Sequence, residues 1–571
     1  DRGGWAVRAD AIEPRRGPGS TSRDILTIAG GSVAEQSEFT IRQLLDLAER
    51  FDVPEVQREL VASARWCAGI IDSLFQEIPF GAPLLYEVDA RSSRPASRYQ
   101  SSSHADWWII NGQQRLTAVL AAFGRRPPWI PQRRWLMLGG PDREVAVRFT
   151  LIGQFSFHPY KPGTPLQIRL ADLLQAAETS TVQRLIVGTG VYDPHRYVER
   201  FAALAQRLLA VRVRVDWLRG DMDKAVTAFI RHNQASASKR LTPEEYRLVA
   251  LSMTCPGLQR DIIDPAVHAA AQAGFPAAIG RPRIVTVMEH LLPPGATRVA
   301  NRRRIDPARI ADAAALAAQG CAATADLLHA CGITGDELLC SPSAVEVLGV
   351  LFARFCDEAA CDDFAGRWLV HIAARGTYHT LGSRHRADAR AVAGAANYRD
   401  AVGALALQVP AGPIPPWDES TLQLGGRARA TWGQPGTLFA LASHAGVAGK
   451  VTDLGDPHVT MSDPRMRLRP LWAAEPGRHR TVAWLAWMTP DTAAVVEGAR
   501  GWGRDAYDAL DCPDAALAAQ CLARPVPALD VDAEIVRRSA AILEMVNTFL
   551  RETEPLRRDA REAVPAQLAV A

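Results

Sequence analysis

One short polar run in the sequence combines side chains suited to binding a charged ligand. Residues 107–124 read WWIINGQQRLTAVLAAFG, an apolar run followed by apolar residues at helical spacing. A strand followed by a helix would place the NGQQR run, residues 111–115, in the turn between them. Backbone N–H groups at a helix N-terminus attract anions such as phosphate, whereas the helix dipole opposes a cation there. Arg115 therefore suggests an acidic ligand, although capping and local hydrogen bonds explain these polar side chains equally well.

Two other stretches place polar side chains at helix ends. VPEVQREL has Gln57 and Arg58 at the expected start of a helix, where a cation again opposes the dipole. AFIRHNQASASKRL has Arg231 and Asn233 two positions apart at the expected end of another helix. Each stretch alone is typical of an exposed surface, so its functional interpretation depends on the other two.

The three stretches, in this order, resemble the N-terminal domain of GmrSD-type modification-dependent restriction enzymes. That family reads I-P-x-Y-Q-R-x-Y-x-W, then D-G-Q-Q-R-L-T, then F-x-R-x-N-x-x-G-x-x-L, and this chain has VPEVQRELVASARW, INGQQRLTAV and AFIRHNQASASKRL. The resemblance implies a ParB/sulfiredoxin-like fold that binds and hydrolyses GTP or ATP with Mg²⁺ and senses modified DNA, usually in phage defence. It implies a nucleotide pocket with Asn111, Gln114 and Arg115 in the catalytic positions. The other residues that it assigns to the pocket are Gln57, Arg58, Gly112, Gln113, Arg231 and Asn233.

The departures from the family pattern bear on hydrolysis. Asn111 stands where the family has Asp, and an amide cannot accept a proton near pH 7. Val56 replaces the usual aromatic residue, and QASASKRL lacks the usual Gly. We therefore expect nucleotide binding to survive these changes better than hydrolysis.

Weaker resemblance continues into the C-terminal part, which is similar to an HNH nuclease module. An HNH site needs a His base and a second His, Asn or Asp to hold a divalent metal on the phosphate. In GDPHVTMSDPRMRLRPLW only His458 of the usual doublet remains, and Trp484 stands where the first Asn would be. The sequence therefore predicts a degenerate nuclease, so a separate nuclease or defence-system subunit would cut the DNA.

Two alternatives stay open at this point. The first is an active modification-dependent HNH endonuclease that uses His458 or His290, with Asp456 and Asp463 as metal ligands. In this version His290, in VMEHLLPP, would pair with Asn301, although a helix end capped by a histidine explains it more simply. The second is a catalytically silent scaffold that binds DNA or a partner protein. Three further histidines follow no metal-binding spacing and are expected on helix surfaces: His371, His379 and His385.

The elements that must position these residues follow from periodicity and capping signals. Thr40 with Gln43, and Thr242 with Glu245, fit capping boxes at helix starts. RWLMLGG and EVAVRFTLIG, separated by GGPD, are interpreted as a strand pair. The fold class is α+β, a small mixed sheet followed by mostly helical domains. The expected divisions are a flexible N-terminus (1–24), the ParB-like domain (25–160), a helical domain (161–407), a linker (408–436) and a helical HNH-like domain (437–571).

Length and composition limit the remaining classes. At 571 residues the chain exceeds a single ordinary core, and its net charge of +3 argues neither for nor against nucleic acid. DNA contacts would need local basic patches, for which 123–135 and 279–310 are candidates. The nine cysteines include no CxxC pair, which indicates reduced thiols in a cytoplasmic protein. With no signal-peptide pattern and no long apolar run, neither secretion nor a membrane partner is expected.

Overall fold

The structure of the protein is a computed structural model. The residues that it describes are 35–57, 60, 62–79, 81–88, 96–99, 105–149, 154–164, 167–178, 181–189, 195–220, 222–235, 242–294, 305–378, 384–409, 413–423, 433–446, 459, 463, 465–471, 481–499, 514–522 and 531–553. The N-terminal residues 1–24, expected to be flexible, lie outside these ranges.

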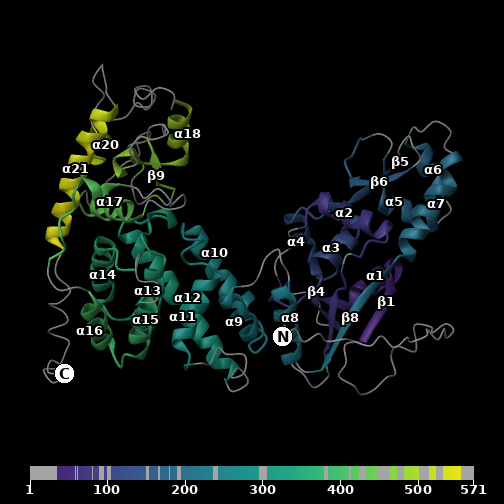
Figure 1. Ribbon diagram of the computed structural model, residues 1–571, viewed down its shortest axis with the longest axis horizontal. Coiled ribbons are helices and arrows are strands. Elements are labelled where there is room, and N and C mark those ends of the chain that lie inside the picture. Colours follow the sequence, from purple (N-terminus) through teal and green to yellow (C-terminus); the bar gives the residue numbers. More distant parts are fainter. Residues whose placement is uncertain are drawn as a thin grey trace, which may run out of the picture.

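A mixed five-stranded sheet organises the N-terminal part of the chain (Figure 1). Its strand order is β1-β8-β3-β4-β2, in which β1 with β8 and β3 with β4 are antiparallel, and β8 with β3 and β4 with β2 are parallel. The strands are β1 (Glu35–Thr40), β2 (Phe51–Asp52), β3 (Leu84–Val88), β4 (Trp107–Asn111) and β8 (Arg212–Gly220). The fold class is therefore α+β, with a small mixed sheet ahead of a mostly helical remainder.

Strand β8 corrects one expectation, because residues 161–407 were expected to be helical. VRVRVDW continues from α7 as a strand between β1 and β3, so the sheet draws on chain beyond residue 160. Apolar residues alternate with charged ones in this run, the period-two pattern of a strand with one buried face. Val213, Val215 and Trp217 enter the core on one face of the sheet.

Helices cover both faces of this sheet. One core contains residues of α1 (Ile41–Leu47), α2 (Ala64–Phe75), α3 (Gln113–Ala122), α5 (Leu170–Glu178), α6 (Val182–Val187) and α7 (His195–Ala210). The opposite face packs on α8 (Met222–Ala235) and α9 (Pro243–Ser252). The predicted capping boxes at Thr40 and Thr242 are both present, with each hydroxyl accepting the N–H of the residue three positions on.

A second, three-stranded sheet of order β6-β5-β7 contributes to the same core. Its strands are β5 (Val145–Phe149), β6 (Phe155–Pro159) and β7 (Gln167–Arg169). The strand predicted at RWLMLGG is wrong: these residues fall mainly in helix α4 (Gln132–Met137), and a 3₁₀ turn (Pro141–Arg143) leads into β5. The apolar run was too short for periodicity to distinguish a strand from a helix.

The rest of the chain is mainly helical. Its elements are η4, a π-helix (Leu258–Ile263), α10 (Asp264–Gln272), α11 (Arg281–Leu291), α12 (Pro307–Ala330), α13 (Ser343–Phe355), α14 (Cys361–Arg375), α15 (Arg384–Gly394), α16 (Tyr398–Gln408), α17 (Gly433–Gly446), β9 (Arg467–Pro470), β10 (Leu485–Met488), α18 (Pro490–Ala499), α20 (Asp514–Ala519) and α21 (Val531–Glu552). Strands β9 and β10 form an antiparallel pair.

One continuous core runs through this helical part, from Leu248 to Leu550. It includes two residues of the expected linker, Trp417 and Leu422, which are 6% and 1% exposed. The backbone N–H and C=O of Trp417 both bond the side-chain amide of Asn547 in α21. Proline and glycine content alone therefore predicted a looser connection than the packing provides.

Candidate functional site

The NGQQR run forms the predicted junction between a strand and a helix. Strand β4 ends at Asn111, α3 begins at Gln113, and Gly112 between them has φ +90°. A Cβ added to Gly112 would lie 2.9 Å from the Cα of Pro83, so both the backbone angle and the close approach require glycine. The side-chain oxygen of Asn111 accepts the N–H of Gly112 at 2.8 Å. Asn111 thus stabilises the turn that presents the start of α3.

Gln113 is the most unusual residue of the run. Its side chain is 2% exposed, yet neither its amide oxygen nor its amide nitrogen has a hydrogen-bond partner in the described structure. One turn further along the same helix, the hydroxyl of Thr117 is likewise buried without a partner there. Buried polar groups are nearly always hydrogen-bonded, so such a pair indicates a place for a polar ligand or water. No side chain caps α3 at Gly112, which leaves the first N–H groups of the helix beside Gln113.

Arg115 points back toward the loop that precedes β3. Its guanidinium packs against Gly81, where an added Cβ would overlap Nη1. Burial lowers the pKa of Arg115, although a guanidinium remains charged at any physiological pH. A half-buried cation therefore lies in the first turn of α3, where the helix dipole disfavours it. This placement fits a site that receives negative charge.

The other two motif stretches pack beside this junction. The Gln57 amide donates to the carbonyls of Ile109 and Ile110, at 3.1 and 2.6 Å, and so fixes its segment to the end of β4. Val56, Ile110 and Phe229 share one hydrophobic cluster. The structure therefore brings together residues of all three stretches, which lie far apart in the sequence.

Not every residue implied by the resemblance can be placed. Arg231 is exposed on α8, one turn from the start of its stretch. Asn233 belongs to the same helix, but its side chain lies outside the described residues, as does all of Arg58. Gln114 is half-buried in the first turn of α3.

Glu55 is a prominent residue that sequence reasoning missed. It is 1% exposed, and its two carboxylate oxygens accept the backbone N–H groups of Gly257 and Arg260 at 2.9 and 3.0 Å. These N–H groups belong to the start of the π-helix η4 in the helical part. Burial raises the pKa of Glu55 to about 7, because desolvation outweighs the two N–H groups and the nearby charge of Arg260. The only sequence signal for this residue was an acidic side chain between apolar neighbours in VPEV.

A second set of contacts joins the same two regions. The Arg98 guanidinium donates to the carbonyl of Glu55 at 2.9 Å and lies 3.2 Å from the carboxylate of Asp264. The Arg260 guanidinium donates to the carbonyl of Ser97 at 3.1 Å. Segments 52–57 and 96–99 thus lie between the NGQQR junction and the helical part of the molecule.

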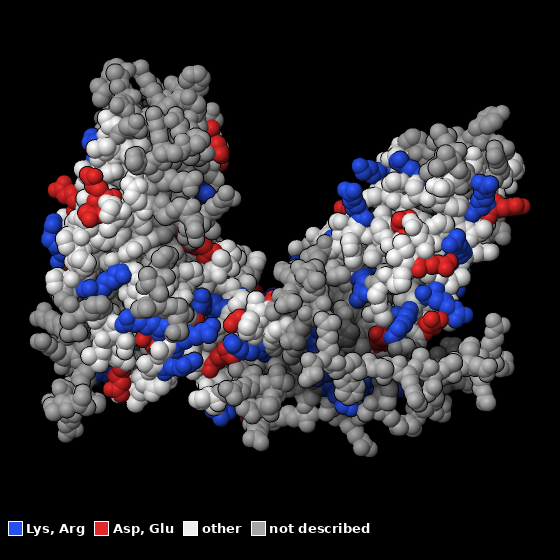
Figure 2. Space-filling view, viewed as in Figure 1, with Lys and Arg blue, Asp and Glu red and all other residues white. Residues whose placement is uncertain are grey.

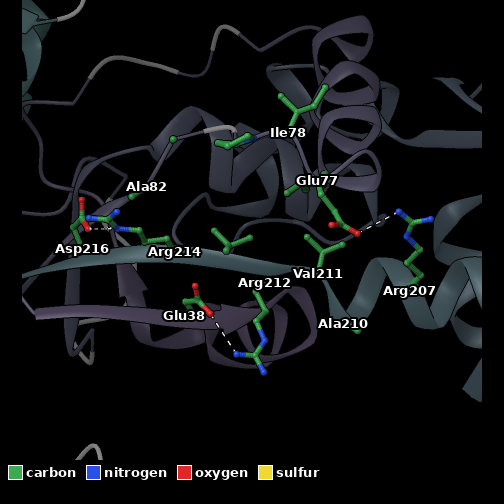
Figure 3. Close-up of a pocket in the computed structure, with 14 residues that line it drawn as sticks. Glu38, Glu77, Ile78, Ala82, Arg207, Ala210, Val211, Arg212, Arg214 and Asp216 are labelled. Atoms are coloured by element: carbon green, nitrogen blue, oxygen red, sulfur yellow. Dashed lines mark hydrogen bonds and ion pairs between the residues drawn. The ribbon is translucent and has the colours of Figure 1, made fainter. Parts of the chain in front are cut away.

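A groove of about 930 Å³ is lined by Gly81 and by residues of β1, α2, α7 and β8 (Figure 3). Leu74, Ile78 and Val213 contribute apolar surface to it. Its charged side chains form ion pairs: Arg207 with Glu77 at 3.3 Å, Arg212 with Glu38 at 3.3 Å, and Arg214 with Asp216 at 3.2 Å. None of these residues was among the site residues expected from the sequence.

The proposed nuclease residues find little support in the geometry. His458, Asp456 and Asn301 lie outside the described residues, and the carboxylate of Asp463 is bound by the N–H and guanidinium of Arg465. His290 does not cap its helix but lies 3.0 Å from the buried carboxylate of Glu346. Across the described ranges, no group of three or more His, Cys, Asp or Glu side chains is placed to hold a metal ion.

Two histidines expected on helix surfaces are buried instead. His371 is 3% exposed within α14, and His385 is 7% exposed within α15. Desolvation lowers the pKa of His385, because its charged form loses more from burial than it gains from Glu346. His379 lies outside the described residues. The sequence did not indicate that these two histidines lie on helix faces that are covered by the rest of the fold.

The basic patches are partly used within the fold. In 279–310, Arg281 pairs with Asp264 at 2.6 Å and Arg283 with Glu346 at 2.6 Å. On the face drawn in Figure 2, blue Lys and Arg side chains lie among red Asp and Glu side chains where the chain is described. The cysteines among the described residues are all free thiols.

Comparison with protein-family models and with curated proteins found no match to this chain. Among the helices in the described ranges, none is both long and apolar enough to cross a membrane.

Proposed function

We propose that the N-terminal α+β part binds the phosphates of a nucleotide, GTP or ATP, at the start of α3. The observation that carries this proposal is the buried, unpartnered amide of Gln113 at an uncapped helix N-terminus. Arg115 adds a half-buried positive charge in the same turn. Helix N-termini with glycine at the preceding turn are well suited to phosphate.

The resemblance to GmrSD-type enzymes supports the wider setting of this proposal. In that setting the chain is a sensing component of a restriction or anti-phage defence system, with a ParB/sulfiredoxin-like N-terminal fold and modified DNA as its partner. A separate nuclease or defence subunit cuts the DNA in this version. The three motif stretches, which converge around Ile110, are the observation in favour.

The residues that support nucleotide binding do not support Mg²⁺ binding or nucleotide hydrolysis. Mg²⁺ prefers carboxylate and water oxygens. The NGQQR run contains no carboxylate, and its one side-chain oxygen at the β4 end, that of Asn111, already accepts the Gly112 N–H. The nearby carboxylate of Glu55 is engaged by two backbone N–H groups. We therefore propose binding and derive no hydrolytic step.

A catalytically silent scaffold remains the second candidate, and the amide at Asn111 favours it. Thermal unfolding with GTP or ATP, with and without Mg²⁺, separates the two. A ligand that binds only the folded state adds about 2.7 kcal/mol at 100 times its Kd. The decisive variant is Gln113→Leu, which removes an unpartnered buried amide. We expect its melting temperature without nucleotide to be equal or higher, and its nucleotide-dependent shift to be lost.

Gln132→Leu is the matched control, because Gln132 is also the first residue of a helix but is exposed. It should keep the full nucleotide-dependent shift. If the native protein shows no shift with either nucleotide, or if Gln113→Leu retains the shift, phosphate binding at α3 is wrong and the scaffold is favoured.

A further inference from the structure

The first residues of strand β8 are paired on one side only, with β1, although β8 lies between β1 and β3 in the sheet. The C=O of Val211 accepts the N–H of Ile41 at 3.0 Å, so odd-numbered residues of this strand direct their backbone groups toward β1. The N–H of Asp216 donates to the C=O of Pro83 at 2.9 Å, so even-numbered residues direct theirs toward β3. Pairing with β3 begins only at Asp216. The backbone N–H and C=O groups of Arg212 and Arg214 therefore face away from β1. They point to the side of β8 on which β3 lies, but β3 begins too late in the chain to pair with them.

The cause of the gap is Pro83. A parallel neighbour would need an N–H at this position to bond the C=O of Arg214, and proline has none. The chain before Pro83 turns away through Gly81, which has φ +84°. Within the described residues, the backbone N–H and C=O of Arg212 and Arg214 take part in no hydrogen bond. The groove of about 930 Å³ runs along this part of β8.

The walls of the groove suit a strand with two different faces. Leu74, at the end of α2, lines it together with Val213. Ile78, just after α2, also lines it and is 51% exposed (Figure 3). Arg212 and Arg214 belong to the opposite, charged face of β8, where they pair with Glu38 and Asp216. In an extended segment, successive side chains point to opposite faces. Apolar residues would therefore meet Leu74 and Ile78, and polar residues would meet the arginines.

We propose that this groove binds an extended peptide segment of a partner protein, which adds a strand beside Arg212–Val215 of β8. Unpaired main-chain groups supply the affinity in this mode of recognition, and side-chain pockets supply the specificity. The occupant is a segment of four or more residues with apolar and uncharged polar side chains in alternation. The site is independent of the proposed nucleotide site, since it uses none of the same side chains.

The test uses the full chain and a synthetic peptide, Lys-Val-Thr-Val-Thr-Val-Lys with blocked ends. Two further versions carry N-methyl groups on all valines or on all threonines, which removes alternate N–H donors. We expect the unmethylated peptide to bind with a Kd below 1 mM. One N-methylated version should lose at least about tenfold in affinity while the other keeps it, since only one set of N–H groups faces β8.

The protein variant Arg214→Pro removes the groove-facing N–H without removing a bond to β1. Arg214→Ala is its matched control, because it keeps that N–H and loses only the ion pair with Asp216. We expect Arg214→Pro to lose peptide binding and Arg214→Ala to keep it, with melting temperatures confirming that both fold. Hydrogen exchange of segment 210–217 should slow when peptide is added to native protein.

Three results would overturn the proposal. They are no binding of the unmethylated peptide at 1 mM, equal binding by both N-methylated versions, and unchanged binding by a folded Arg214→Pro variant. The unpaired groups of Arg212 and Arg214 would then serve only to bind water. Nucleotide-dependent stabilisation is measured separately, so its failure and the failure of peptide binding are distinguishable.

Discussion

Gly112 holds the turn between β4 and α3 in a backbone conformation that other residues rarely adopt. We predict that Gly112→Ala lowers the free energy of unfolding by about 2–4 kcal/mol, from a positive φ and a Cβ too close to Pro83. The control is Gly163→Ala, where φ is +75° and an added Cβ meets no atom within 4 Å. It should cost only about 1–2 kcal/mol. Denaturant titration of both variants measures the difference, and equal losses would contradict the close contact with Pro83.

Glu55 predicts a pH dependence with a definite sign. Its pKa rises on folding from 4.5 to about 7, so the folded state holds the proton more tightly. Its contribution to stability is therefore fully present below pH 4.5 and declines as the pH rises to about 7, by about 3 kcal/mol. Glu55→Gln cannot titrate. The stability of native protein minus that of Glu55→Gln, measured from pH 4.5 to 7.5, should fall with rising pH; a flat difference would show that Glu55 ionises normally.

The sequence identified the NGQQR run as a candidate site, but it did not identify all the residues that matter in the structure. The Gly in NGQQR and the apolar run before it predicted the turn, because both signals are local. Arg115 attracted attention through its charge, whereas the unpartnered amide of Gln113 depends on which helix face is covered. Glu55 has its partners 202 and 205 residues away, so no local pattern could assign them.

Helices α12 and α13 cross at two glycines. A Cβ on Gly320 would lie 2.7 Å from the N of Ala353 and would overlap the carbonyl of Gly349. We predict that Gly320→Ala forces the helices apart and destabilises the protein by about 1–3 kcal/mol, despite the better helix propensity of alanine. Gly69→Ala in α2 is the control, since nothing lies within 4 Å of its added Cβ. Thermal melting should show a gain there of about 0.5–1 kcal/mol; a gain in both variants would contradict the tight crossing.

Elements were predictable where capping and period agreed. The helices that begin after Thr40 and Thr242, and strand β4, follow from signals within a few residues. Strand β8 was missed, although apolar and charged residues alternate along it. The helical pattern of the preceding residues was assumed to continue through it. Helix α4 was missed because the apolar run at residues 135–138 is too short to distinguish a helix from a strand by its period.

The contacts between the N-terminal part and the helical part predict measurable coupling. Arg98 is 7% exposed at its side chain and lies 3.2 Å from Asp264. In a double-mutant cycle of Arg98→Ala and Asp264→Ala, we expect a coupling energy of about 1–3 kcal/mol in unfolding. The control cycle uses Arg50 and Asp106, whose side chains are 41% and 50% exposed at a separation of 2.6 Å. Its coupling should stay below about 1 kcal/mol; similar values in the two cycles would argue against a desolvated contact.

The sequence also predicted a domain boundary at residues 408–436 that the packing of the core does not show. Proline and glycine at 408–436 predicted a linker, yet Trp417 and Leu422 enter the core that extends from Leu248 to Leu550. Composition reports where a chain can bend, whereas burial depends on partners such as Asn547, far away in the sequence.

The position of β8 also has a consequence for biosynthesis. β1 pairs with β8, so its partner strand emerges from the ribosome roughly 170 residues later. At about 5–20 residues per second, β1 waits on the order of 10–30 s without its partner strand. During that interval β3 also lacks its neighbour, because β8 joins the two. Until β8 is translated, the edges of β1 and β3 that it later covers are open to pairing with other chains, and this is the stage at which a chaperone would protect the nascent chain most.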